Sequence, residues 1–162
     1  MVIYVIDTSA LIDLARWYPM DRQFFRPIWA KIEELISSNK MVAPYEVLRE
    51  IDSRSDELSN WAHGRRDMFI HPTADQIAFI GQIKDAYDDS YWEREANKTG
   101  PWADPWIIAL ALHYREGSVV REDVKIVTRE SKWKPNRIPQ IASKFGIESL
   151  DVLEFLWEIG IR

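Results

Sequence analysis

The chain of 162 residues contains no cysteine, so disulfide bonds and thiolate metal sites are excluded. Its six glycines are scattered singly, which rules out a glycine-rich dinucleotide fingerprint and a phosphate-binding P-loop. Long apolar runs are absent as well, because a run such as residues 106–112 is far shorter than the roughly 20 residues that span a membrane. The N-terminus lacks the basic segment of a signal peptide. We therefore expect a cytoplasmic protein that does not enter membranes.

The chain also lacks an excess of positive charge, since its formal net charge is −5. This argues against coating nucleic acid by bulk electrostatics, but it permits a local contact made by a few basic residues and bound cations. Hydrophobic residues make up 46% and charged residues 29%, the balance of a globular domain, and we expect one domain over residues 1–162. The eight tryptophans should pack in the core and in grooves, with a partner-binding surface as the alternative.

Expected strands and helices alternate along the chain. Short apolar runs predict buried strands at residues 2–6, 41–43 and 124–128. Periodicity predicts helices at residues 8–19, 25–38, 44–51, 55–68, 73–97, 105–114, 138–145 and 150–159. Thr8 or Ser9 is the expected first N-cap, and a capping box begins at Thr73. This alternation predicts a three-layer α/β/α fold with a central parallel sheet, whose ligand site lies outside the carboxyl ends of the strands.

Two acidic residues follow the first two strands. Asp7 ends residues 2–6, where its alternative role is a helix cap or a partner of the helix dipole. Glu50 lies soon after the second strand and shares a helical face with Glu46, so the alternative is an acidic pair facing solvent. Their places after strand ends favour one common edge of the sheet.

Two further acids occupy comparable places. Asp104 heads the most apolar helix of the chain, where it could also act as a cap in front of Pro105. Glu130 follows the strand at residues 124–128, a commonplace position by itself. Converging carboxylates repel one another and raise their pKa values unless a cation neutralises them. Oxygen ligands without cysteine select Mg²⁺ or Mn²⁺, and such ions held by carboxylates cut phosphodiesters.

The ordered set of these segments resembles the PIN-domain family of metal-dependent ribonucleases over nearly the whole chain. It looks most like the small single-domain (VapC-like) members that are toxins of toxin–antitoxin pairs. The four segments that resemble the family's motifs are YVIDTSALIDL, VAPYEVLREI, WADPWIIALA and KIVTRE. The resemblance implies a PIN-like fold and a catalytic metal site of Asp7, Glu50, Asp104 and Glu130. It assigns secondary roles to Ser9, Glu46 and Thr128.

The resemblance further implies an RNA substrate, products with 5′-phosphate and 3′-hydroxyl ends, a cognate antitoxin protein and a homodimer. Glu130 departs from the family pattern, which usually has Asp two residues after the Thr of the fourth motif. Glutamate keeps the charge but moves it by one methylene, so this residue would contact the metal directly, through water or not at all.

A basic segment adjoins the fourth acid. RESKWKPNR carries an aromatic, Trp133, among basic residues, namely Arg129, Lys132, Lys134 and Arg137. We expect these five residues to bind RNA, by phosphate contacts and base stacking, with a solvated loop as the alternative. Arg65 and Arg66 are a weaker candidate for the same role.

Other functions remain open. A PIN-like domain without catalytic activity would bind a partner instead, and another metal-dependent phosphohydrolase would use the same acids. A phosphatase of the haloacid-dehalogenase type is disfavoured, because Ser9 stands where its second Asp is required. The three histidines, His63, His71 and His113, show no spacing typical of metal ligands or a catalytic triad.

Overall fold

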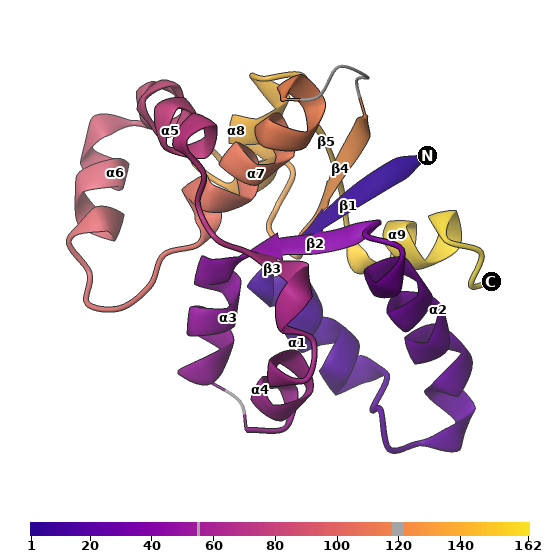
Figure 1. Cartoon of the computed structure of the whole chain (residues 1–162). Coiled ribbons are helices and arrows are strands. Elements are labelled where there is room, and N and C mark those ends of the chain that lie inside the picture. The colour runs from indigo at the N-terminus through magenta and orange to yellow at the C-terminus, as the bar shows by residue number, and fades with distance from the viewer. Residues whose placement is uncertain (55, 118–121) are drawn as a thin grey trace.

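The computed structural model describes residues 1–54, 56–117 and 122–162 (Figure 1). Its centre is a five-stranded sheet in which every neighbouring pair is parallel. The strands are β1 (Val2–Ile6), β2 (Met41–Pro44), β3 (Phe69–Ile70), β4 (Asp123–Val127) and β5 (Glu148–Leu150). The predicted α/β class with a central parallel sheet is therefore confirmed.

Helices cover both faces of this sheet (Figure 1). One face carries α1 (Thr8–Trp17), α2 (Arg26–Ser37), α3 (Tyr45–Asp52), α4 (Asp56–His63) and α9 (Val152–Glu158). The other carries α5 (Ala74–Ala86), α6 (Asp89–Ala96), α7 (Asp104–Glu116) and α8 (Ile138–Ser143). Short 3₁₀ turns lie at Gln23–Phe25 and Arg66–Met68. Among the described residues, none of these helices combines the length and the hydrophobicity that crossing a membrane requires.

The strand order β3-β2-β1-β4-β5 contains one change of direction. The chain steps outward from β1 to β3 and then returns to β4, on the other side of β1. Ile6 pairs with Val127, and the Asp7 amide donates to the Val127 carbonyl at 2.9 Å. Asp7 and Thr128 therefore leave the sheet side by side, at the kind of switch point where open α/β sheets bind ligands.

The core lies on both faces of the sheet, and α7 is the most deeply buried helix on one of them. Residues 107–111 of α7 are completely buried, as are Val5 and Ile6 of β1. Because α7 contacts β1, β2 and β4, apolar side chains are needed around most of its circumference. This explains its almost uninterrupted apolar sequence and fixes the start of α7 against the sheet edge.

Several sequence expectations about strands and helix ends are wrong. The edge strands β3 and β5 were not expected, and Leu150 belongs to β5 rather than to the last helix. The helix expected at residues 55–68 ends at His63, while Ser55 lies outside the described residues. The helix expected at residues 73–97 is divided at Tyr87 and Asp88, where Asn136 accepts from the Asp88 amide and donates to its side chain. A tertiary contact thus holds the break.

The expected caps also differ. The N-cap of α1 is Asp7, and Thr8 is already helical, because the Asp7 carboxylate reaches the Thr8 amide. Thr73 occupies the N-cap position of α5 but makes no capping hydrogen bond with its side chain. Its hydroxyl donates to the Asp75 carboxylate instead, which leaves the expected capping box unformed.

Candidate functional site

Asp7 is the centre of the site. Its side chain is only 3% exposed, and it accepts three hydrogen bonds. Oδ1 accepts from the Thr8 amide at 2.8 Å, and Oδ2 accepts from the hydroxyls of Ser9 at 2.7 Å and Thr128 at 2.9 Å. The two hydroxyls come from α1 and from the end of β4. They fix the orientation of a carboxylate that directly follows β1.

The same hydroxyls position the segment after β4. The Thr128 hydroxyl accepts from the Glu130 amide at 3.1 Å, and the Ser9 hydroxyl accepts from the Arg129 amide at 3.0 Å. Each hydroxyl thus connects Asp7 to the backbone that carries the fourth acid. The predicted secondary residues Ser9 and Thr128 therefore lie in the site, where they link its acidic side chains.

Glu50 reaches the site from α3. Its Oε1 accepts from the Thr8 hydroxyl at 2.5 Å, and its Oε2 accepts from the Ala103 amide at 3.4 Å, just before α7. Glu46 instead accepts from Arg49 at 3.1 Å, one turn away on α3. Of the two acids on this helical face, Glu50 therefore contacts the elements that surround Asp7.

Asp104 and Glu130 complete the acidic group. Asp104 is the first residue of α7, and the N-cap is Ala103, so Asp104 does not take the alternative role of a cap in front of Pro105. The charge of Glu130 is one of the causes that raise the pKa of Asp104, so the two carboxyl groups lie within electrostatic reach of each other. Oε2 of Glu130 also accepts from the Ile138 amide at 3.0 Å, at the start of α8.

The pKa values show that these acids share one electrostatic environment. Burial, then the charges of Glu130 and Glu50, raise the pKa of Asp7 to about 7, against the opposing bonds from Ser9 and Thr128. Burial and the charges of Glu130, Asp7 and Glu50 raise the pKa of Asp104 well above its ordinary value. Burial also raises the pKa of Glu50, although Thr8 and Arg54 oppose the shift. The negative charge on one of these carboxyl groups therefore makes it harder for its neighbours to lose their protons.

Tyr87 is a neighbour of the site that the sequence did not indicate. It is 4% exposed, and its hydroxyl has no hydrogen-bond partner among the described residues. Burial and the charges of Asp104 and Glu130 raise the pKa of this phenol. The expected continuous helix over residues 73–97 concealed it, because the break at this residue turns its side chain into the protein.

The donor set suits a hard cation in kind, since carboxylate oxygens are the ligands that Mg²⁺ and Mn²⁺ prefer. Within residues 1–54, 56–117 and 122–162, however, no three acidic or histidine side chains are grouped as a metal site. Both carboxylate oxygens of Glu50 accept from protein donors, Thr8 and Ala103, and one oxygen of Glu130 accepts from the Ile138 amide. The acids are brought together, but they do not form a closed coordination shell.

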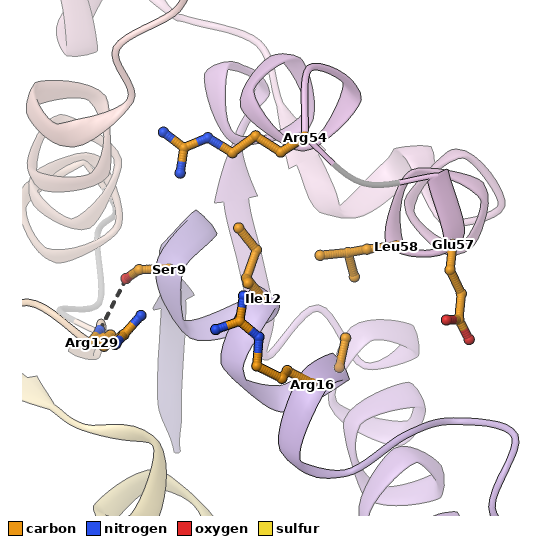
Figure 2. A pocket seen from close by; sticks show the side chains of 8 residues that line it. Ser9, Ile12, Arg16, Arg54, Glu57, Leu58 and Arg129 are labelled. Carbon is orange, nitrogen blue, oxygen red and sulfur yellow. Dashed lines mark hydrogen bonds between the residues drawn. The ribbon is translucent and has the colours of Figure 1, made fainter.

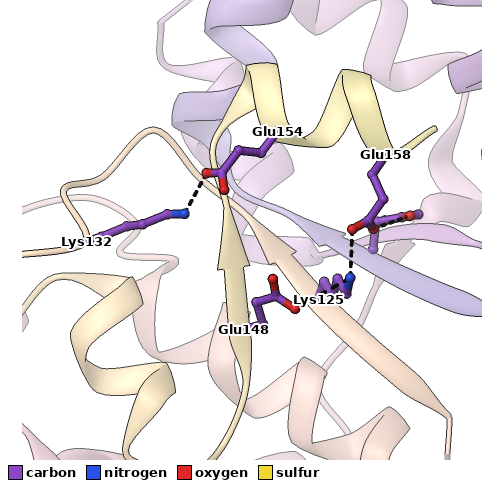
Figure 3. Close-up of polar contacts among 6 residues, drawn as sticks. Lys125, Lys132, Glu148, Glu154 and Glu158 are labelled. Carbon is purple, nitrogen blue, oxygen red and sulfur yellow. Dashed lines mark hydrogen bonds and ion pairs between the residues drawn. The ribbon is translucent and has the colours of Figure 1, made fainter. Parts of the chain in front are cut away.

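The basic segment after β4 is partly engaged in ion pairs. Lys132 contacts Glu154 at 2.6 Å, beside a similar pair of Lys125 and Glu158 (Figure 3). Trp133 is 87% exposed. The remaining basic residues differ in their surroundings: Arg129 lies 3.5 Å from Asp13, Arg137 donates to Tyr91, and Lys134 is exposed.

The weaker basic candidate is placed elsewhere. Arg65 donates to Glu33 and lies over the ring of Trp61, while Arg66 contacts His63. None of these contacts includes one of the four acids. The structure therefore does not bring Arg65 and Arg66 to the site.

Comparison with known proteins adds a family but no function. A search of curated proteins finds no match to this sequence. One family model matches residues 4–162, and its description is "Domain of unknown function (DUF4411)". Because this match spans nearly the whole chain, the protein belongs to the DUF4411 family.

Proposed function

We propose that this chain is a Mg²⁺- or Mn²⁺-dependent endoribonuclease. The observation that carries the proposal is the meeting of Asp7, Glu50, Asp104 and Glu130 beside the switch point of the sheet, with raised pKa values at the first three. A group of acids that destabilise one another's charge gains from a cation. Carboxylate-bound Mg²⁺ or Mn²⁺ is a recurring device for cutting phosphodiesters.

In this mechanism Asp7, Glu50 and Asp104 hold the cation and Glu130 completes the site. The bound cation supplies an activated water and neutralises charge on the phosphate. The hydroxyls of Ser9 and Thr128 keep Asp7 oriented, and the Ile138 amide keeps one oxygen of Glu130 in place.

RNA as the substrate, rather than another phosphate ester, rests on the resemblance of the four motifs to PIN domains. The same resemblance supports a cognate antitoxin and a homodimer. Two alternatives use the same geometry: a PIN-like domain without activity that binds a partner, and a phosphohydrolase that acts on small esters. We favour the ribonuclease because basic side chains border the acids, as an RNA strand requires.

The test is cleavage of single-stranded RNA by the purified chain with Mn²⁺, compared with its Asp7→Asn variant. We expect cleavage by the wild type, none in EDTA, and nearly complete loss in Asp7→Asn. Glu34→Gln is the matched control, since Glu34 is an exposed carboxylate of α2 that pairs with Lys31. Equal cleavage by Asp7→Asn and wild type would refute the assignment. Turnover of small phosphate esters without RNA cleavage would favour the phosphohydrolase.

A further inference from the structure

A pocket of about 450 Å³ opens next to the acids, between α1 on one side and Arg54 and α4 on the other (Figure 2). Ser9 belongs both to this pocket and to the acidic site, because its hydroxyl donates to Asp7 at 2.7 Å. The same hydroxyl accepts from the Arg129 amide, and Arg129 also lines the pocket (Figure 2). A ligand in the pocket would therefore lie directly beside the acids.

Three arginines line the pocket, and they come from three segments (Figure 2). Arg16 lies near the end of α1, Arg54 follows α3, and Arg129 follows β4. Within the described part of the chain, the guanidinium groups of Arg16 and Arg54 form no hydrogen bond or ion pair, and both residues are exposed. Arg54 lowers the pKa of Glu50, which places its charge within electrostatic reach of the acids. On an acidic protein, this is a local site for an anion.

The wall between the arginines is apolar. Ile12 and Ala15 of α1 line it, together with Leu58 of α4. The carboxylate of Glu57, which also lines the pocket, points away from the three arginines in Figure 2. Guanidinium groups around an apolar wall suit a ligand that carries both a phosphate and a flat or ring-shaped apolar part. An unstacked nucleotide has this composition, whereas a nucleotide within a duplex keeps its base stacked.

We propose that this pocket binds one nucleotide of single-stranded RNA, next to the phosphodiester that the acids act on. Arg16, Arg54 and Arg129 contact its phosphates, and the wall of Ile12, Ala15 and Leu58 receives its base or ribose. The position next to a cut bond rests on the proposed ribonuclease function. The binding of RNA by the pocket rests on the arginines, the volume and the apolar wall.

The test measures binding of a fluorescein-labelled single-stranded RNA of about ten nucleotides, a length within the site sizes of single-strand binders. Anisotropy is recorded with Mg²⁺ in an Asp7→Asn background, so that the RNA is not cut. We expect Arg16→Ala and Arg54→Ala each to weaken binding about tenfold at low salt. The double variant should also reduce the slope of log K against log salt by about 1.4, the value for two lost phosphate contacts on a single strand.

Matched variants separate the pocket from general charge. Arg22→Ala with Arg26→Ala removes the same charge from two exposed residues outside the pocket, and it should leave binding nearly unchanged. Ala15→Leu fills part of the apolar wall and should weaken binding without changing the salt slope. Circular dichroism and thermal unfolding check that each variant is folded. Equal effects of the pocket and control variants would overturn the proposal.

Two ligand comparisons complete the test. Equal affinity for a duplex RNA of the same length would overturn the single-strand assignment. Equal affinity for an oligoglutamate peptide of the same charge would make the pocket a site for acidic peptides, and would also overturn it.

Cleavage by the same arginine variants, with Asp7 intact, separates this proposal from the ribonuclease. If the wild type cleaves RNA and the Arg16→Ala and Arg54→Ala variants cleave it equally fast at low RNA concentration, only the proposal for the pocket is refuted. Weakened RNA binding by these variants, without any metal-dependent cleavage by the wild type, supports the pocket and refutes the ribonuclease.

Discussion

The carboxylate of Asp7 accepts three hydrogen bonds, yet its pKa is raised to about 7. Hydrogen bonds to a carboxylate stabilise its charged form, so the opposing contributions must be larger. They are the burial of the side chain and the charges of Glu130 and Glu50. The hydroxyls of Ser9 and Thr128 therefore orient this side chain, but they do not stabilise its charged form enough to offset burial and the neighbouring charges.

Stability should consequently fall as the pH rises. The pKa of Asp7 in the folded protein lies above its value of 3.8 in an unfolded chain, so between about pH 4 and pH 7 the folded protein holds a proton that the unfolded chain has lost. In EDTA, the free energy of unfolding should decrease from pH 5 to pH 8, with a contribution from Asp7 of about 2.7 kcal/mol, because its pKa of about 7 in the folded protein lies two pH units above the start of this range. Asp104 acts in the same direction. Urea denaturation across this pH range measures the effect.

Asp7→Asn is the matching variant, because the side-chain oxygen of Asn can still accept the hydrogen bond from the Thr8 amide, while the side chain does not titrate. It should be more stable than the wild type at pH 8 and differ less at pH 5. A pH profile in Asp7→Asn as steep as that of the wild type would contradict the role given to this carboxyl group.

Substitutions of Glu130 can separate the effect of its side-chain length from the effect of its charge. Its bond to the Ile138 amide ties it to α8, and its charge raises the pKa of Asp104. If Glu130 only tunes the site, Glu130→Gln should reduce Mn²⁺-dependent cleavage about 10- to 100-fold, and Glu130→Asp should stay within about tenfold of the wild type. Cleavage rates with saturating Mn²⁺ measure both. Complete loss in Glu130→Gln, as in Asp7→Asn, would instead make Glu130 a direct ligand.

The unpartnered hydroxyl of Tyr87 gives a prediction about stability alone. A buried hydroxyl without a hydrogen bond destabilises the folded state, so Tyr87→Phe should raise the free energy of unfolding, by about 1 kcal/mol. The ring contacts with Trp92 and Trp102 remain in this variant. Urea denaturation in EDTA provides the measurement. A loss of stability would mean that the hydroxyl is bonded in solution.

At the scale of elements, α9 is held by a complete capping box. Asp151 accepts from the Glu154 amide at 2.8 Å, and the Glu154 side chain accepts from the Asp151 amide at 3.1 Å. Asp151→Ala should lower the free energy of unfolding by about 1 kcal/mol. Asp151→Asn keeps the cap acceptor and should cost less. Equal stability of wild type and Asp151→Ala in urea would show that α9 does not depend on this cap.

The sequence predicted the elements that form the centre of the fold, for a physical reason. β1, β2 and β4 are buried strands of four or five residues, long enough to give an apolar run. β3 and β5 have two and three residues and lie at the sheet edges, so neither produces a recognisable pattern. The break between α5 and α6 depends on Asn136, far along the chain, and a local pattern does not contain that information.

The same distinction applies to the site. Acids after strand ends were predictable, because parallel strands bring their carboxyl ends to one edge of the sheet. Arg16 and Arg54 were not, since an exposed arginine beside a helix gives no signal in the sequence. Tyr87 looked like one more residue of a long helix. The distribution of charge around the acids therefore had to come from the structure.

At the scale of the whole molecule, a bound cation should offset the repulsion among the acids. Mn²⁺ that binds only the folded chain stabilises it by RT ln(1 + [Mn²⁺]/Kd), about 2.7 kcal/mol at 100 times Kd. We expect thermal unfolding to shift upward with Mn²⁺, more at pH 8 than at pH 5, because protons compete for the same carboxylates. Asp104→Asn should shift much less. A Mn²⁺ effect that is the same in this variant would place the cation elsewhere.

The pairing of β1 with β4 also has a consequence for biosynthesis. A ribosome makes Asp7 before its partner Thr128, which follows 121 residues later. Until then β1 has a neighbour on one side only, and Asp7 meets neither Thr128 nor Glu130. Contacts of such long sequence separation form late in folding. A nascent chain thus carries Asp7 without an assembled site until Thr128 and Glu130 have been made, and any activity can begin only after that.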